Sequence, residues 1–136
     1  MEKALISGLN YVTGRIVDEN DAIMFDIDDT LLRKDGTIIK EMVYLFQICK
    51  SLGYKMVVIT ARPYSEENVK YTKKQLDLNH ITPSMLVFAD PEKKTLAKEE
   101  LKLHFVLSVG DLYTDLGGSD HSIKLPDLND NNIYIR

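Results

Sequence analysis

The stretch AIMFDIDDTLL, residues 22–32, decides the fold that we predict for this chain. An apolar run at 23–25 leads directly into Asp26, and Asp28 and Asp29 follow within three residues. Apolar residues that end in a group of acids are typical of a buried strand in a parallel sheet, whose carboxyl end is where ligands bind in open α/β folds. Carboxylates crowded into one pocket repel one another, and a divalent cation such as Mg²⁺ relieves that repulsion. We therefore expect a metal-dependent site at the end of this strand.

Strands and helices are predicted to alternate along the rest of the chain. Short runs of β-branched and other apolar residues predict strands, and apolar residues at three- and four-residue spacing predict helices. With the first strand at 22–27, the other strands are expected at 55–60, 85–89, 104–109 and 133–135, and the helices at 3–17, 39–52, 64–78 and 91–103. This alternation predicts an α/β fold, a three-layer sandwich around a central, mostly parallel sheet of five strands.

One domain is expected to contain all residues 1–136, with an N-terminal helix inside 1–20. A chain of this length can bury a proper core without a second domain. An Asp-Gly pair predicts a turn within 31–38, close to the first acids. The spans 26–60 and 60–94 have room for this turn, one helix each and a strand, so no large cap domain is expected.

Composition limits the classes of function that we consider. The formal net charge of −4 argues against a general attraction to nucleic acid or to anionic membranes. Cys49 is the only cysteine, so no internal disulfide forms, and its apolar neighbours indicate a core residue rather than a nucleophile. No run approaches the ~18 apolar residues of a membrane span. The N-terminus has no basic region followed by an apolar core, so we expect a cytoplasmic protein without membrane contact.

The acids at 26–30, DIDDT, match the pattern DxDxT. This pattern resembles the nucleophile motif of the haloacid dehalogenase (HAD) superfamily of phosphatases, which have a Rossmann-like fold. The resemblance implies that Asp26 attacks phosphorus and forms an aspartyl-phosphate, and that Asp28 is the general acid and base. It also implies that the turn at 31–38 is a flap over the nucleophile. The alternative is a group of aspartates that only form turns and cap helices.

The second predicted strand ends in Thr60, which Ala61 and Arg62 follow. In the HAD family a Ser or Thr here binds phosphate oxygens through its hydroxyl, together with the next amide. Thr60 and Ala61 are therefore candidate phosphate ligands, because neutral donors suit a developing anion. Arg62 either grips a phosphate with its guanidinium fork or pairs with Glu66 on the next helix.

A lysine at the start of a helix is the third element that the resemblance implies, to neutralise the nucleophile and the phosphate. Lys94 is the preferred candidate and Lys93 is the next. The run from Lys94 to Leu101 is similar to the pattern K-S-x-x-R-x-E-L of plant-type acid phosphatases. On the same segment, Lys98 and Lys102 are interpreted as solvated surface charges.

The predicted strand at 104–109 leads into GDLYTDL, residues 110–116. This resembles the family motif GDxxxD, whose first Asp binds Mg²⁺. Asp111 would then complete an octahedral Mg²⁺ shell with Asp26 and the carbonyl oxygen of Asp28. Asp115 would support the site, either as a ligand or as the partner of the lysine. The alternative for Asp111 is the N-cap of a short helix.

The C-terminal part of the sequence indicates which branch of the HAD superfamily the chain resembles. Residues 110–135 are similar to the class B acid phosphatases and plant vegetative storage proteins, with IKLP at 123–126 and IYI at 133–135 in the same order. The resemblance implies a Mg²⁺-dependent hydrolase of phosphomonoesters that acts on a phosphorylated small molecule or on a macromolecular end.

Other functions stay open, and one of them is phosphotransfer to an acceptor alcohol on the same scaffold. Members without a cap act on large substrates or use a partner subunit as a lid, so an oligomer is one option. Arg62-Pro63 followed by Glu66 is similar to the phosphatase domains of polynucleotide kinases, which would make nucleic acid a substrate only. A non-enzymatic storage or binding protein is another alternative, but such members typically lack the nucleophile that Asp26 would supply.

Overall fold

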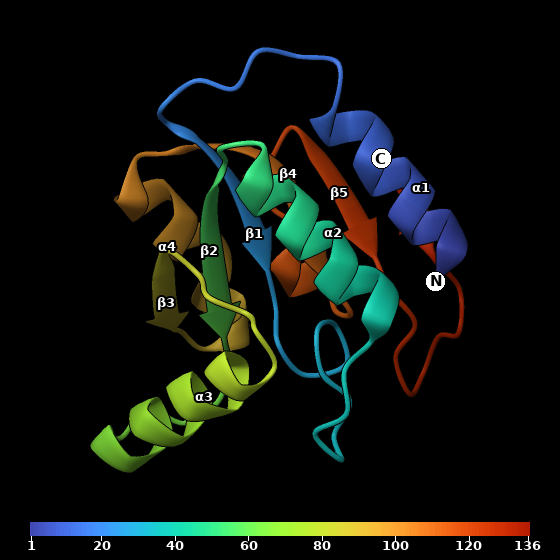
Figure 1. Ribbon diagram of the computed structural model, residues 1–136. Helices are drawn as coiled ribbons and strands as arrows, with labels where there is room; N and C mark the ends of the chain where they lie inside the picture. Colours follow the sequence, from blue (N-terminus) through green and yellow to red (C-terminus); the bar gives the residue numbers. More distant parts are fainter.

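A six-stranded sheet forms the centre of the computed structural model, which describes all residues 1–136 (Figure 1). The strand order is β3-β2-β1-β4-β5-β6; the first five strands are parallel and β6 runs antiparallel to β5. The strands are β1 (Asp21–Phe25), β2 (Lys55–Thr60), β3 (Met85–Phe88), β4 (His104–Gly110), β5 (His121–Lys124) and β6 (Tyr134–Ile135). The predicted α/β fold with a mostly parallel sheet is confirmed.

The sheet has one strand more than the five that were expected. β5, with the sequence HSIK, pairs in parallel with β4, from Leu107 opposite His121 to Gly110 opposite Lys124. A strand of four residues with one strongly apolar side chain has no clear periodicity, so its pairing with β4 rather than its local sequence defines it.

Four helices surround the sheet: α1 (Glu2–Val12), α2 (Lys40–Ser51), α3 (Glu66–Leu78) and α4 (Lys94–Leu101). The predicted helix at 3–17 is too long, because the chain leaves the helix at Val12. Gly14 has a left-handed backbone (φ 71°), a conformation that ends helices. Ile16, which lies inside the predicted helix, is 85% exposed.

Each face of the sheet has its own apolar layer. On one face, Ile23 and Phe25 of β1 pack with the buried side of α2, including Phe46 and Cys49. On the other face, Met24 belongs to a smaller cluster against which α4 packs. All five residues of β1 are buried, as a strand covered on both sides requires. No helix is both long and apolar enough to span a membrane.

The turn at 31–38 and helix α3 lie near the carboxyl edge of the sheet. Asp29 has a left-handed backbone (φ 60°), which Asp tolerates better than most residues, and its N–H donates to the carbonyl of Leu32. Leu32 and Ile38 then form an antiparallel bridge. In Figure 1, α3 projects from the body of the protein at this edge, and only Thr72 and Leu76 of α3 are buried.

Candidate active site

The carboxyl ends of β1 and β4 bring two separated acids together. These strands are neighbours, and the N–H of Asp26 donates to the carbonyl of Val109 at 3.0 Å, two residues before Asp111. One carboxylate oxygen from each of Asp26, Asp111 and Asp115 lies within 4.8 Å of the others. All three side chains are buried. The parallel sheet therefore creates a compact acidic cluster from residues far apart in the sequence.

Lys94 lies at the centre of this cluster. Its Nζ donates to Asp26 Oδ1 at 3.0 Å and to Asp115 Oδ1 at 2.6 Å, and the side chain is almost fully buried. Burial works to lower the pKa of Lys94, but the two carboxylates outweigh it and the pKa lies above the ordinary value. Lys93, the second candidate, is exposed on the preceding turn. Of the two lysines, the structure brings only Lys94 into contact with the acids.

Asp115 is fully committed to contacts within the protein. Its Oδ1 accepts from Lys94, and its Oδ2 accepts from the N–H of Leu112 at 3.1 Å. A Cβ on Gly110 would lie 2.2 Å from Asp115 Oδ2, so only glycine leaves room for this side chain. Of the two roles predicted for Asp115, the contacts favour the lysine partner over the metal ligand.

Asp26 and Asp111 are the two acids of the site whose ionised forms are unfavourable in the folded protein. Burial and the negative charge of Asp115 raise the pKa of Asp26 well above its usual range. Burial raises the pKa of Asp111 as well. Because carboxylate oxygens of the two residues lie within 4.8 Å of each other, a proton on one of them relieves the repulsion between their charges. A divalent cation could take the place of that proton, and two carboxylates completed by other oxygens are a ligand set that fits Mg²⁺.

Arg62 forms an ion pair with Asp28, which the sequence did not predict. Its Nε and Nη2 donate to the two carboxylate oxygens of Asp28 at 3.0 Å and 2.9 Å. Its Nη1 donates to Thr72 Oγ1 on α3 at 3.1 Å. Of the two alternatives for Arg62, the pair with Glu66 is not formed, because the guanidinium points back to Asp28 after β1, and the phosphate contact stays a prediction. Asp28 is thereby separated from the acidic cluster and oriented by a cation.

Thr60 lies at the buried end of β2. Its side-chain oxygen accepts from the N–H of Arg62 at 3.2 Å, and the residue is 1% exposed. Ala61 and Arg62, rather than Thr60, line the open cavity. The hydroxyl of Thr60 therefore holds the loop that carries Ala61 and Arg62.

An open cavity of about 370 Å³ lies above the acids. Its floor contains Asp26, Asp111 and Lys94, and Asp28 with Arg62 forms one side. The remaining wall comes from the turn at 31–38 and from the chain between β5 and β6. The cavity therefore brings together nearly all the residues singled out in the sequence.

Lys98 lies close to the site. The prediction that Lys98 is a solvated surface charge is wrong. It is 1% exposed, and its Nζ donates to the carbonyl of Asp115 at 2.5 Å and to that of Gly117 at 2.7 Å. A third bond goes to Ser108 Oγ on β4 at 2.9 Å. The signal in the sequence was the spacing of four from Lys94, which places both lysines on one helix face.

Comparisons with known proteins give one match. A family model described as haloacid dehalogenase-like hydrolase matches residues 23–133, from within β1 to the residue before β6. The matched span includes the acidic cluster, Lys94 and all the residues that line the cavity. Curated proteins provide no match to the chain.

Proposed function

The chain belongs to the haloacid dehalogenase-like hydrolases, and from that premise we propose that it is a Mg²⁺-dependent phosphatase that hydrolyses phosphomonoesters. One observation supports this proposal most directly. Lys94 contacts both Asp26 and Asp115, and it lies beside Asp111 at the floor of an open cavity. An ammonium group in this position attracts a phosphate and favours the ionised, nucleophilic form of Asp26.

The first half of the reaction forms an aspartyl-phosphate. Lys94 holds Oδ1 of Asp26. The other oxygen of Asp26 attacks phosphorus in line with the leaving oxygen, and the bond from phosphorus to that oxygen breaks. Asp28 lies on the cavity wall and supplies a proton to the leaving group. The backbone N–H of Ala61 and the guanidinium of Arg62 are the proposed donors to the phosphoryl oxygens.

The second half releases phosphate. Asp28, now ionised, takes a proton from a water molecule, whose oxygen attacks the phosphorus of the aspartyl-phosphate. The bond between phosphorus and Asp26 breaks, and both aspartates return to their starting state. Arg62 orients the Asp28 carboxylate through two hydrogen bonds and favours its ionised form, which suits the base of this second half.

Asp26, Asp111 and the backbone carbonyl of Asp28 are the proposed Mg²⁺ ligands. When bound, Mg²⁺ would neutralise charge on the carboxylates and on the phosphoryl group, which otherwise repel each other. Asp115 is proposed to act through Lys94. The narrower resemblance of the tail to the class B acid phosphatases is part of this proposal.

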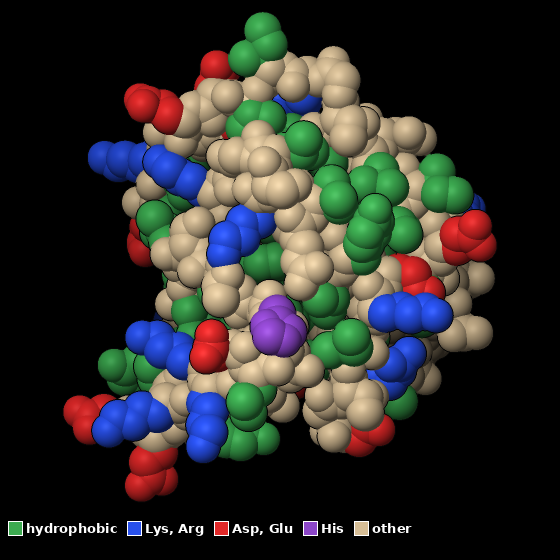
Figure 2. Space-filling view, viewed as in Figure 1, with side chains coloured by type: hydrophobic (Ala, Val, Ile, Leu, Met, Phe, Trp, Pro, Cys, Tyr) green, Lys and Arg blue, Asp and Glu red, His purple; other side chains and the backbone are tan.

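Phosphorylated nucleic-acid ends are a second candidate substrate, because α3 projects beside an open cavity and carries Lys70, Lys73 and Lys74. Figure 2 shows acidic side chains next to the basic ones over this helix, at the lower left. Glu66, Glu67 and Asp77 balance the three lysines. This mixed surface favours smaller phosphomonoesters over a nucleic-acid strand.

The test is hydrolysis of 4-nitrophenyl phosphate with Mg²⁺ and with EDTA. We expect turnover that requires Mg²⁺ and that falls at least about a thousandfold in Asp26→Asn, because the amide cannot form the intermediate. Asp77→Asn, on the exposed side of α3, is the matched control and retains activity. Turnover in Asp26→Asn comparable to the wild type would refute the mechanism, and no turnover under any condition would favour a binding role.

A further inference from the structure

The catalytic cavity continues into a second cavity between two loops. We call residues 31–38 the flap and residues 126–130 the tail turn. The second cavity, of about 290 Å³, shares four residues with the catalytic cavity: Asp29, Lys34 of the flap, and Asp127 and Leu128 of the tail turn. Its other lining residues are Arg33 and the apolar side chains of Met1, Ile39 and Pro126. The two cavities form a groove that leads from the acids to a partly apolar end.

The tail turn is held firmly in its position. Asp127 Oδ1 accepts from the N–H groups of Asn129 and Asp130 at 2.7 Å and 2.8 Å. Asp127 Oδ2 lies 3.2 Å from Nζ of Lys124, whose side chain is 1% exposed at the end of β5. The ammonium of Lys124 also lies 5.2 Å from the ring centre of Tyr113. Leu128 therefore stands on a turn fixed by charge-assisted bonds, and not on a loose end of the chain.

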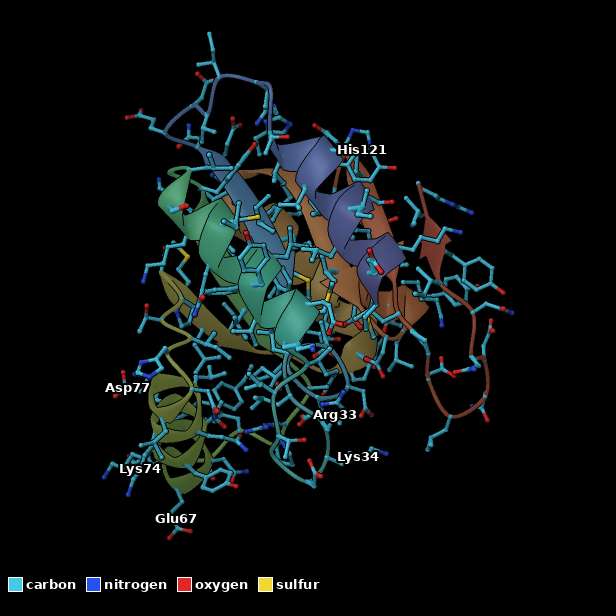
Figure 3. The ribbon with its side chains drawn as sticks, turned by 45° about the vertical axis from the view of Figure 1, so that its right-hand side comes forward. Arg33, Lys34, Glu67, Lys74, Asp77 and His121 are labelled. Carbon is cyan, nitrogen blue, oxygen red and sulfur yellow. The ribbon has the colours of Figure 1, made fainter.

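Leu128 and Lys34 present unused binding groups to this groove. Leu128 is 88% exposed although it lines both cavities. A single exposed leucine is ordinary, but at the wall of a groove its apolar surface gains free energy only when a ligand covers it. Lys34 is exposed and its ammonium has no partner within the protein, whereas Lys94 and Arg62 are both in ion pairs. Figure 3 shows Lys34 on the flap, with Arg33 close by.

We propose that the second cavity is a subsite for the leaving group, and that it selects phosphomonoesters whose leaving group combines an apolar body with a second anionic group. The phosphoryl group lies at Lys94, the apolar body lies against Leu128, and Lys34 binds the second anion. This inference rests on the proposed phosphatase function, since it names the substrate class of that site.

The experiment compares four substrates that differ in these two properties. Phenyl phosphate is apolar without a second anion, 4-carboxyphenyl phosphate has both features, glycerol 3-phosphate has neither, and 3-phosphoglycerate has only the anion. The wild type is expected to have its highest kcat/KM with 4-carboxyphenyl phosphate. Leu128→Ser should lower kcat/KM about tenfold for the two aryl substrates and leave the other two unchanged.

Lys34→Gln should lower kcat/KM about fivefold for the two carboxylate substrates only, and this loss should shrink at high salt. The matched controls are Leu78→Ser at the end of α3 and Lys102→Gln next to the start of β4, both exposed and outside the two cavities. Equal kcat/KM for all four substrates, or variants that change all four alike, would overturn the subsite while leaving the phosphatase intact. No hydrolysis of any substrate by the wild type would instead refute the proposed function, and the subsite with it.

Discussion

Arg62 holds Asp28 in a fork of two nearly equal hydrogen bonds, 3.0 Å and 2.9 Å long, between residues 34 positions apart. The two residues follow neighbouring strands, β2 and β1, so the contact crosses the carboxyl edge of the sheet. A planar guanidinium that binds both oxygens fixes the direction of a carboxylate as well as its charge. The proposed general acid and base is thereby held in one orientation before any substrate binds.

Arg62→Ala is expected to lower kcat about tenfold or more, because Asp28 loses its orienting partner. Arg62→Lys should recover only part of the loss, since an ammonium cannot form the two parallel bonds. Steady-state kinetics with 4-nitrophenyl phosphate measure both effects. Glu66→Gln serves as the control and should behave like the wild type, and equal losses in Glu66→Gln and Arg62→Ala would argue against this role for Arg62.

Asp26→Asn is expected to be more stable than the wild type when metal is removed. The pKa of Asp26 is raised by burial and by Asp115, so the folded state keeps its proton to a higher pH than the unfolded chain. Stability therefore falls as pH rises from about 4 through the raised pKa, and the ionised group costs stability at neutral pH. A gain of about 1 kcal/mol, near 4 °C in Tm, is expected by thermal unfolding in EDTA at pH 7.5. A lower Tm for Asp26→Asn would contradict this reasoning.

Mg²⁺ is expected to raise the Tm of the wild type, because a cation that binds only the folded state stabilises it. At a Mg²⁺ concentration of about 100 times Kd, the gain is about 2.7 kcal/mol. Asp111→Asn should remove most of this shift, whereas Asp77→Asn should keep it. Thermal unfolding across a Mg²⁺ titration gives the measurement, and a full shift in Asp111→Asn would exclude Asp111 as a ligand.

Lys98→Met is expected to destabilise the protein by about 2 kcal/mol at pH 7, because the carbonyls of Asp115 and Gly117 lose their buried donor. Burial lowers the pKa of Lys98 to about 8. Between this value and the ordinary value of 10.5, the unfolded chain binds more protons than the folded protein, so the wild type gains stability as pH rises. The difference between wild type and Lys98→Met should therefore widen from pH 8 to 10 in urea unfolding. A constant difference would show that Lys98 titrates normally.

His104 should stabilise the protein at mildly acidic pH. Hydrogen bonds to Asp21 and Asp120, at 2.7 Å and 2.6 Å, raise its pKa above 6.5. Its stabilisation is therefore complete below pH 6.5 and is lost as pH rises through the raised pKa. Because His104 is about half exposed, the effect is expected to be only about 0.5 kcal/mol.

The measurement for His104 is the free energy of unfolding at pH 5.5 and 8.5. His104→Gln should be less stable than the wild type at pH 5.5 and nearly equal to it at pH 8.5. His80→Asn, at an exposed position whose left-handed backbone suits asparagine, is the control. A difference that is larger at pH 8.5 would reverse the predicted sign.

Local patterns were enough to predict much of the fold and the set of residues that meet at the site. The apolar run before Asp26 predicted β1, and the Gly-Asp pair after the fourth expected strand placed Asp111 at the same edge. Parallel strands with helical crossovers must align their carboxyl ends, so these acids and Lys94 could be expected close together. Their chemical roles are the proposals tested above.

Contacts between distant segments decided the rest. Lys98 is buried because the chain at 115–118 covers it, and the four-residue spacing from Lys94 gives its helix face but not the segment that covers that face. Arg62 pairs with Asp28, and not with Glu66 four residues later in the sequence, because β1 and β2 are adjacent in the sheet. β5 is a strand because its backbone pairs with that of β4. Hydrophobic periodicity is a property of short stretches, whereas burial and the choice of a charged partner depend on which segments the sheet order brings into contact.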